Sequence, residues 1–371
     1  MQAENKLALD LSQRNASVSF LRAIVAWAIF FFHYVERYPQ HFPSVFSAWA
    51  SDWFMLVNVF FVLSGFLLTL RYLPIAQTSA NGWIKGFYMA RIARILPLYF
   101  LALTLFFILQ PNSDTKIYWL NFSLTKTYFS RYVFTGISQS WTLSIDGLFY
   151  LLFPVLLFLL RRSLWLLLGS SLLFYLFGLM LVWHLGFYMP WNFMPSVEYM
   201  LIYSLFGRIM EFLLGMVLAS ICISGNTFRY RVLHSASLVW AFSSGLVLLY
   251  LFHYYKFDFR WWGIYGSLGI LIQNVLFPAL VIVPVLWLLI QQVPGKLGSG
   301  LESMMVLLGS SSYAFYLFHV SPLADWILQL FHGQIWALFL AIQVLSILVF
   351  RYFEEPVRKW LMRQFGSGLS S

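Results

Sequence analysis

Residues 20–34 read FLRAIVAWAIFFFHY, an apolar run with one arginine near its start and one histidine near its end. With its flanks, at about 18–36, the run is long enough to cross a bilayer, which takes about 20 mostly apolar residues in a helix. Such runs recur along the chain, of which 61% is hydrophobic and only 10% charged. A soluble globular domain carries roughly 25% charged residues. The sequence therefore predicts an all-α integral membrane protein.

The apolar runs predict a polytopic bundle of about ten transmembrane helices. The spans lie at about 18–36, 53–70, 95–110, 141–160, 163–186, 206–223, 236–255, 263–290, 304–331 and 334–353. The third is short and the eighth and ninth are long, so tilted or broken helices are expected. If the N-terminus is cytoplasmic, 15 of the 23 Lys and Arg residues lie on the cytoplasmic side and 6 on the other. This asymmetry predicts that both termini are cytoplasmic.

One membrane domain fills most of the chain. We expect a cytoplasmic segment at 1–17, a transmembrane domain at 18–353 and a cytoplasmic tail at 354–371. The net charge of +10 does not indicate a nucleic-acid partner, because most basic residues flank apolar runs. The single cysteine, Cys222, cannot build a disulfide framework or a thiolate zinc site, and we expect no metal. The sequence contains no GxSxG, HExxH, Walker or GxGxxG motif.

The first span holds an arginine and a histidine where hydrocarbon is expected. Arg22 and His33 are 11 residues apart, which is ~1100° of helical turn and roughly 16 Å of axial rise, so both share one helix face. A charged side chain inside a membrane is costly and indicates a functional site. Imidazole can act as a general base near neutral pH. The structural alternative, a snorkelling arginine and an unrelated interfacial histidine, is about equally supported by spacing alone.

Other spans carry polar groups for which a structural role is a strong alternative to a functional one. Asp146, beside Ser144 and Trp141, is expected to face a cation or a wet cavity, and a purely structural ion pair is the alternative. Arg208 and Glu211, at i and i+3, can neutralise each other, which favours a structural role.

Three further segments of the sequence add candidates. Arg91 and Arg94, one turn apart in a basic cytoplasmic loop with Lys85, can together grip one anionic ligand, although positive-inside topology explains them equally well. His319, followed by Asp325, is more often a hydrogen-bonded bundle residue than a catalytic one. Ser64 precedes Gly65 in a pair that indicates a close helix contact, and no base lies near it in the sequence.

Taken in order, these segments resemble the membrane-bound acyltransferase-3 family, the multi-span O-acyltransferases of bacterial surface and secreted glycans. The resemblance runs from about residue 20 to 360 and rests on seven segments. They are FLRAIVAWAIFFFH, VNVFFVLSGFLLT, ARIARILPLYF, SWTLSIDGLFYLLFP, RIMEFLLGMVLA, SSYAFYLFHVSPL and FEEPVRKW, the last with Glu354 two residues before Pro356. One departure is visible: Asp146 stands where the family commonly has Glu, so its carboxylate reaches one methylene less far.

The resemblance implies an acyl transfer, in the simplest case of acetyl from acetyl-CoA or another acyl-CoA, to a hydroxyl of a carbohydrate or glycolipid in the bacterial cytoplasmic (inner) membrane. No tightly bound cofactor is expected. His33 suits a base or acyl carrier, Arg22 a donor-binding or orienting role, and Asp146 proton transfer or orientation of an imidazole. Arg91, Arg94 and Lys85 suit the donor entrance. Supporting polar roles fall to Arg208, Glu211, His319, Ser64 and Glu354.

Two other functions stay open at this point. A transporter or exporter of a small anionic or sugar-like substrate would use the same buried polar groups as a path, but no inverted internal symmetry is visible in the sequence. A catalytically silent scaffold is the other possibility. Neither explains the order of the motifs.

Overall fold

The computed structural model describes residues 16–78, 82–110, 114–185, 192–224, 243–245, 266–290 and 298–365, and within these ranges it is almost entirely helical. The helices of the first half are α2 (Ala16–Arg37), α3 (Ser44–Ala50), α4 (Val57–Thr78), α5 (Trp83–Leu109), α6 (Thr115–Phe122), α7 (Trp141–Arg162) and α8 (Leu164–Leu185). Those of the second half are α9 (Val197–Tyr203), α10 (Leu205–Ser224), α12 (Ser267–Leu271), α13 (Val283–Ile290), α14 (Ser299–Phe318), α15 (Pro322–Leu330), α16 (Ile335–Val349) and α17 (Glu355–Phe365).

Short non-α turns join or interrupt these helices. The 3-10 turns are η1 (Pro39–His41), η2 (Trp53–Leu56), η3 (Lys126–Tyr128) and η4 (Ser138–Ser140), and the π turns are η5 (Ile272–Leu276), η6 (Pro278–Ile282) and η7 (Phe350–Glu354). A π turn inside a helix is rare and often occurs at a functional site.

In the part of the chain that the structure describes, eight helical stretches are long and apolar enough to cross a membrane, or nine if the bent pair α14–α15 is one span. A multi-pass helical membrane protein is thereby confirmed. The predicted span at 236–255 lies outside the described residues apart from 243–245. The predicted third span, 95–110, was too short, because α5 already begins at Trp83. The expected break in the ninth span is confirmed as a 95° bend between α14 and α15.

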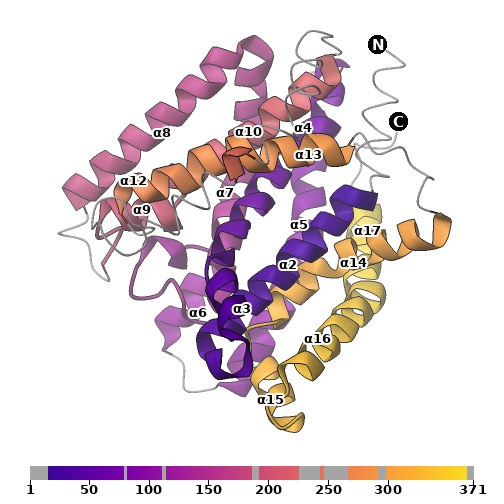
Figure 1. The fold of residues 1–371 in the computed structure, drawn as a ribbon. Coiled ribbons are helices and arrows are strands. Elements are labelled where there is room, and N and C mark those ends of the chain that lie inside the picture. Colours follow the sequence, from indigo (N-terminus) through magenta and orange to yellow (C-terminus); the bar gives the residue numbers. More distant parts are fainter. Residues whose placement is uncertain are drawn as a thin grey trace.

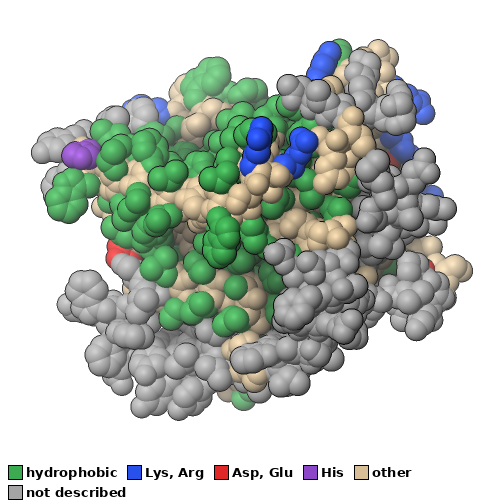
Figure 2. Space-filling model, turned by 90° about the horizontal axis from the view of Figure 1, so that it is seen from above, with side chains coloured by type: hydrophobic (Ala, Val, Ile, Leu, Met, Phe, Trp, Pro, Cys, Tyr) green, Lys and Arg blue, Asp and Glu red, His purple; other side chains and the backbone are tan. Residues whose placement is uncertain are grey.

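The bundle has two ends, which we name after the two ends of α2. The Ala16 end, toward the upper right of Figure 1, holds the start of α2, the end of α4 and α17. The Arg37 end, at the bottom, holds α3, α6 and α15. Figure 2, which looks onto the Ala16 end, shows Lys and Arg side chains spread over that face and few acidic ones. The prediction that this end faces the cytoplasm fits that distribution and stays a prediction.

Glycines bring two pairs of central helices into close contact. A Cβ atom added at Gly65 of α4 would lie 2.0 Å from the carbonyl oxygen of Phe212 of α10. Gly215 of α10 meets the Val62 carbonyl equally closely, and Gly309 of α14 lies against Ser19 of α2. Small residues of this kind let membrane helices approach backbone to backbone. The predicted contact at Ser64–Gly65 is confirmed, and it leaves Ser64 beside the interior of the bundle.

The periphery of the bundle is apolar and exposed. On α8, Trp165 and Trp183 are 80% and 83% exposed. A protein surrounded by water rarely exposes large contiguous apolar patches. Such a helix is expected where lipid covers it, which agrees with the membrane interpretation.

The segment between α6 and α7 is held by one buried lysine. Lys126 is fully buried, and its Nζ donates to the carbonyl oxygens of Thr135 (2.8 Å) and Ile137 (2.6 Å). Burial lowers the pKa of this amine well below its usual value. Gln139, two residues after Ile137, donates from Nε2 to the carbonyl oxygens of Tyr316 and Leu317, at 2.9 Å each. These bonds fix the start of α7 against the end of α14, which places the polar groups described next.

Candidate active site

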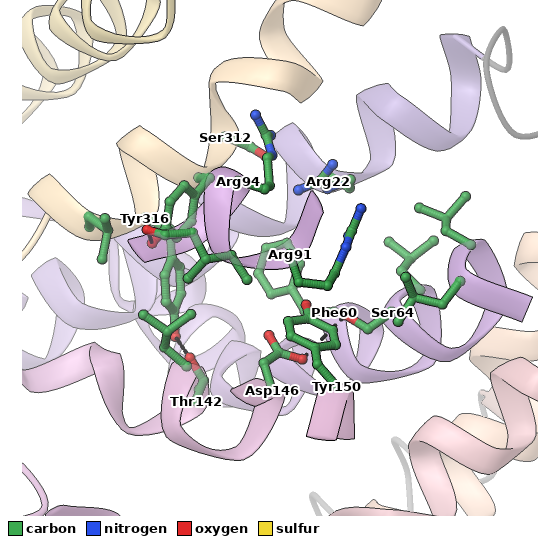
Figure 3. Close-up of a pocket in the computed structure, with 17 residues that line it drawn as sticks. Arg22, Phe60, Ser64, Arg91, Arg94, Thr142, Asp146, Tyr150, Ser312 and Tyr316 are labelled. Atoms are coloured by element: carbon green, nitrogen blue, oxygen red, sulfur yellow. Dashed lines mark hydrogen bonds between the residues drawn. The ribbon is translucent and has the colours of Figure 1, made fainter. Parts of the chain in front are cut away.

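A cavity of about 150 Å³ lies among α2, α4, α5, α7 and α14. Figure 3 shows arginine side chains reaching it from α2 and α5, with Asp146 of α7 on the other side. Its polar lining comes from residues that are far apart in the sequence, namely Arg22, Ser64, Arg91, Arg94, Thr142, Asp146, Tyr150, Ser312, Tyr313 and Tyr316. Asp146 is the one carboxylate among the cavity's described lining residues, so three guanidiniums face a single acid.

The basic residues Arg91 and Arg94 do not lie in a loop, as the sequence had suggested. Because α5 begins at Trp83, both belong to the helix and project from it one turn apart into the cavity. Arg94 is paired: its Nη1 donates to Glu354 of η7, and its Nη2 donates to the Ser310 carbonyl at 3.2 Å. The π turn η7 presents Glu354 at this point. The boundary predicted at residue 354 therefore falls inside a helical stretch that packs on α5.

The other two cavity arginines form no direct ion pair with any described residue. Within the described ranges no carboxylate oxygen lies within 4 Å of Arg22 or Arg91, and the buried Nε of Arg91 has no hydrogen-bond partner there. The Arg91 guanidinium lies over the ring of Tyr150, 5.9 Å from its centroid. A buried cation normally has a counter-ion or a coordinating group, since desolvation is costly. These two guanidiniums are thus suited to an anionic ligand.

The opposite wall of the cavity carries an acid and hydroxyl groups. Ser64 Oγ donates to Asp146 Oδ1 at 3.3 Å. Thr142 and Tyr150 lie one turn before and one turn after Asp146 on α7, and both line the cavity. Thr142 Oγ1 lies 3.0 Å from the Tyr316 hydroxyl. The wall can therefore orient a carboxylate and exchange protons through neighbouring hydroxyls.

The two histidines form a pair beyond this cavity. The His33 and His319 rings lie with centroids 5.4 Å apart, and His319 is completely buried. Nδ1 of His319 is 2.8 Å from the Tyr316 carbonyl oxygen. Because a carbonyl can only accept, Nδ1 carries the proton and Nε2 carries a lone pair. That Nε2 has no hydrogen-bond partner among the described residues.

Arg22 and His33 share a face of α2, as their spacing predicted, but they do not line the same cavity. The cavity includes Arg22 but not His33. Eleven residues of helix separate the two side chains by roughly 16 Å along α2, and Tyr316, which lines the cavity, packs on His319 with ring centroids 5.5 Å apart. Tyr316 therefore stands between the arginine cavity and the histidine pair. Arg22 and His33 therefore point to the same side of α2 but belong to different sites.

Arg208 and Glu211 form the ion pair that the sequence predicted, at 2.7 Å on α10. The guanidinium also donates to the side-chain oxygens of Asn58 and Asn274, at 2.8 Å each, and to the Ile202 carbonyl. Asn274 belongs to the π turn η5. This group of residues, the Arg208 cluster, ties α4, α10 and η5 together and does not line the cavity.

The remaining candidates lie elsewhere. Lys85 is exposed and does not line the cavity. Asp325 pairs with Arg37 at 3.5 Å. In the described part of the chain no three His, Cys, Asp or Glu residues are placed to hold a metal ion.

Sequence reasoning missed five polar residues of this region: Thr142, Tyr150, Ser312, Tyr313 and Tyr316. A signal existed for two of them. Thr142, Asp146 and Tyr150 recur every four residues, which places them on one face of a helix. The two tyrosines of α14 gave no such signal, because aromatic residues occur throughout the chain.

With this geometry described, comparison with known proteins becomes informative. Residues 15–351 match the acyltransferase-3 family, described as an acyltransferase domain. The chain belongs to this family. Proteins named "Putative O-acetyltransferase" in Staphylococcus aureus strains COL and N315 are each 25% identical over 370 residues, which covers 91% of this chain and 56% of the relative. "O-acetyltransferase OatA" of S. aureus strain NCTC 8325 is 30% identical over 133 residues, 31% of this chain and 22% of that protein.

The acyltransferase domain accounts for most of this chain, whereas the chain spans little more than half of the length of the first two relatives. No solved structure matches the chain. The resemblance inferred from the ordered motifs is confirmed by the family match.

Proposed function

We propose that the chain is an integral-membrane O-acyltransferase that moves an acyl group from acyl-CoA to a hydroxyl of a carbohydrate or glycolipid, in the bacterial cytoplasmic membrane. One observation carries this proposal: in a member of the acyltransferase-3 family, Arg22 and Arg91 face Asp146 across one cavity and, among the described residues, neither has a carboxylate oxygen within 4 Å. The names of the relatives support acetyl as the transferred group.

The arginines are suited to hold the donor. A CoA thioester carries its negative charge on phosphates, and the planar fork of a guanidinium binds phosphate oxygens in pairs. Arg94 is already paired with Glu354, so it does not provide a further cation for the donor. Because the thioester is at the end of the long, flexible pantetheine arm, a donor gripped at Arg22 and Arg91 can present its carbonyl deeper in the bundle, toward Tyr316 and the histidine pair.

The transfer itself needs a base and an environment with little water. We assign His33 as the base: it takes the proton of the acceptor hydroxyl while the hydroxyl oxygen forms a bond to the thioester carbonyl carbon. The carbon–sulfur bond breaks, and the CoA thiolate leaves and is protonated to the thiol. Asp146, held by Ser64, is a second group that can carry a proton at the donor side. Burial of these groups limits hydrolysis of the thioester by water.

Mass spectrometry of cell-envelope glycans from cells with and without the protein tests the proposed function. We expect an added mass per sugar that depends on the protein and identifies the acyl group. A strain expressing Arg22→Lys serves as a second comparison, because an ammonium cannot reproduce the fork of a guanidinium and should leave the mass increment reduced. An unchanged glycan together with altered flux of a small molecule would instead favour a transporter.

The role of His33 has a sharper test. His33→Ala should lower turnover of acyl-CoA by about 10²–10⁴-fold while the protein remains folded in the membrane, because a general base contributes about that much. His41, an exposed histidine at the same end of α2, provides the matched control, and His41→Ala should keep full turnover. A folded His33→Ala protein with normal acyl transfer would remove His33 from the mechanism.

A further inference from the structure

Two cavities adjoin each other at the Arg37 end of the molecule. One is a polar groove of about 350 Å³ between the end of α5, the segment 134–138 and the start of α15. The other is an apolar pocket of about 210 Å³ along the last two turns of α5. Phe106, Ser321 and Pro322 line both, so the groove and the pocket form one continuous depression with two chemical characters.

The bend between α14 and α15 creates this depression. The chain turns by 95° between Phe318 and Pro322. Ser321 caps α15, its Oγ accepting from the Ala324 backbone nitrogen at 3.2 Å, and Pro322 needs no partner for a backbone N–H. A sharp bend leaves space that a straight helix would fill. Both the groove and the pocket are lined by residues of the bend, Ser321 and Pro322.

The polar groove carries the groups that recognise a hydroxyl-rich ligand. Arg37 and Asp325 form an ion pair in it whose side chains are 42% and 51% exposed. An exposed ion pair contributes little to stability, so its members can exchange one another for ligand hydroxyls at small cost. Phe134, 56% exposed, adds an aromatic surface to the lining of the groove, of the kind on which the C–H groups of a sugar can pack. Polar groups placed beside an aromatic surface are typical of a small-molecule site.

The apolar pocket carries almost no polar group. Leu105, Ile108 and Leu109 of α5 line it and are exposed, on a surface where a membrane protein meets lipid. A hydrocarbon chain gains little affinity by leaving lipid for such a pocket, because both are apolar. What the pocket supplies is position: a chain lodged there places the attached head group in the groove.

The histidine pair lies next to the groove. Arg37 follows His33 by four residues and so lies one turn further along the same face of α2. Ser321 follows His319 by two residues. The pair is therefore flanked by the arginine cavity through Tyr316 and by the groove through Arg37 and Ser321. An acceptor in the groove would approach His33 from the side opposite to the donor.

We propose that this depression is the acceptor site and that the acceptor is an amphiphile, a sugar linked to a lipid chain, with its sugar in the groove and its chain in the apolar pocket. The inference rests on the proposed acyl transfer and narrows its acceptor class. A free polysaccharide would use the groove and leave the pocket without purpose. We assign the pocket to the chain of the acceptor, because the pocket shares three lining residues with the groove but only Leu317 with the arginine cavity.

Photolabelling tests the binding separately from the chemistry. The full chain in phosphatidylglycerol–phosphatidylcholine nanodiscs is irradiated with dodecyl glycosides of glucose and N-acetylglucosamine that carry a diazirine on the chain, and the labelled residues are mapped by mass spectrometry. We expect labelling at Leu105, Leu109 or Leu323 to exceed labelling on α8 roughly tenfold, a preference of about 1.4 kcal/mol. Unlabelled dodecyl glycoside should compete, whereas dodecanol and methyl glycoside at the same concentration should not.

A pocket-filling variant provides the control on site. Ala102 is buried against the pocket, and Ala102→Phe should reduce the labelling roughly tenfold. Thr104→Phe adds the same ring on the exposed side of α5, outside the pocket, and should leave labelling unchanged. If Ala102→Phe does not fold, as judged by gel filtration, Ala102→Leu replaces it with a smaller expected reduction.

Three results would overturn the inference. Equal labelling on α8 means that the pocket holds only bulk lipid. Competition by long-chain acyl-CoA but not by alkyl glycosides assigns the pocket to the donor's acyl chain. Labelling unaffected by both Ala102 variants places the chain elsewhere. Acyl transfer to any acceptor, measured separately, decides the proposed function, so a functioning transferase without this labelling pattern loses only the acceptor assignment.

Discussion

The Arg208 cluster and the arginine cavity both place guanidinium groups inside the helix bundle, yet they differ in how those groups are satisfied. Arg208 donates to the carboxylate of Glu211 on its own helix and to two amide oxygens and a carbonyl from α4, η5 and α9. Arg22 and Arg91 have no carboxylate oxygen within 4 Å in the described structure. A buried cation that the protein itself neutralises holds helices together, and one that is left unneutralised is suited to bind an anion. The comparison separates a structural arginine from a functional one.

The largest expected effect is on Arg208. Arg208→Met should leave no folded protein or strongly reduce its thermal stability, because removing one partner of a buried ion pair costs about 3–5 kcal/mol. Fluorescence-detected gel filtration of heated membrane extracts measures this loss. An Arg208→Met protein that stays folded but no longer binds acyl-CoA would place Arg208 in the ligand site and break the comparison.

The two carboxylates provide a matched pair, since each faces arginines in one of the two regions. Asp146→Asn should retain stability and lower acyl transfer by about 10²–10⁴-fold, the usual contribution of a proton-transferring group. Glu211→Gln should retain activity per folded molecule and lose stability, because Arg208 would keep a hydrogen bond but lose its counter-charge. Turnover normalised to folded protein distinguishes the two outcomes, and a reversed pattern would contradict the assignment of regions.

Arg91 should affect donor binding rather than folding. Arg91→Gln removes a cation that has no carboxylate partner, so the folded state should be as stable as before. The dissociation constant for acyl-CoA should rise by about 10–100-fold, as expected when a charge-assisted hydrogen bond of about 1.5–3 kcal/mol is lost. Isothermal titration calorimetry with a non-hydrolysable acyl-CoA analogue measures this dissociation constant. An unchanged affinity would mean that Arg91 does not bind the donor and only contributes to the orientation of the protein in the membrane.

The smallest effect is expected at Lys85, six residues before Arg91 on the same helix. Lys85→Gln should change both stability and donor affinity by less than about 0.5 kcal/mol, because the side chain is exposed and lies outside the cavity. The same two assays serve. A donor affinity lowered as much as in Arg91→Gln would extend the donor site onto the face of the bundle.

Much of the arrangement was predictable from local pattern. The spans followed from runs of apolar residues, the Arg208–Glu211 pair from i,i+3 spacing, and the Gly65 contact from its small size. The period-four spacing of Thr142, Asp146 and Tyr150 is also visible in the sequence, and it places the three residues on one helix face. Each of these features depends on neighbours within one helix, and helical periodicity is regular enough to be read without coordinates.

Other features depended on which helices meet. His319 had been assigned a structural role, and only the packing of α14 on α2 brings it within 5.4 Å of His33, 286 positions away. The pairing of Arg94 with Glu354 joins residues 260 positions apart. Lys126, which lies between two predicted spans, is fully buried. None of these distances has a local signature, because helix contacts are set by the shapes of whole surfaces.

By itself the sequence determined that this is a multi-pass helical membrane protein of the acyltransferase-3 family and which polar residues enter its spans, because hydrocarbon imposes both the length and the composition of every helix. The tertiary structure decided how those polar residues divide: Arg22, Arg91 and Asp146 into one cavity, Arg208 and Glu211 into a cluster, His33 and His319 into a pair between two cavities. The close approach of helices at Gly65, Gly215 and Gly309, and the bend at Pro322, set these positions, and such contacts act between segments that the chain order keeps apart.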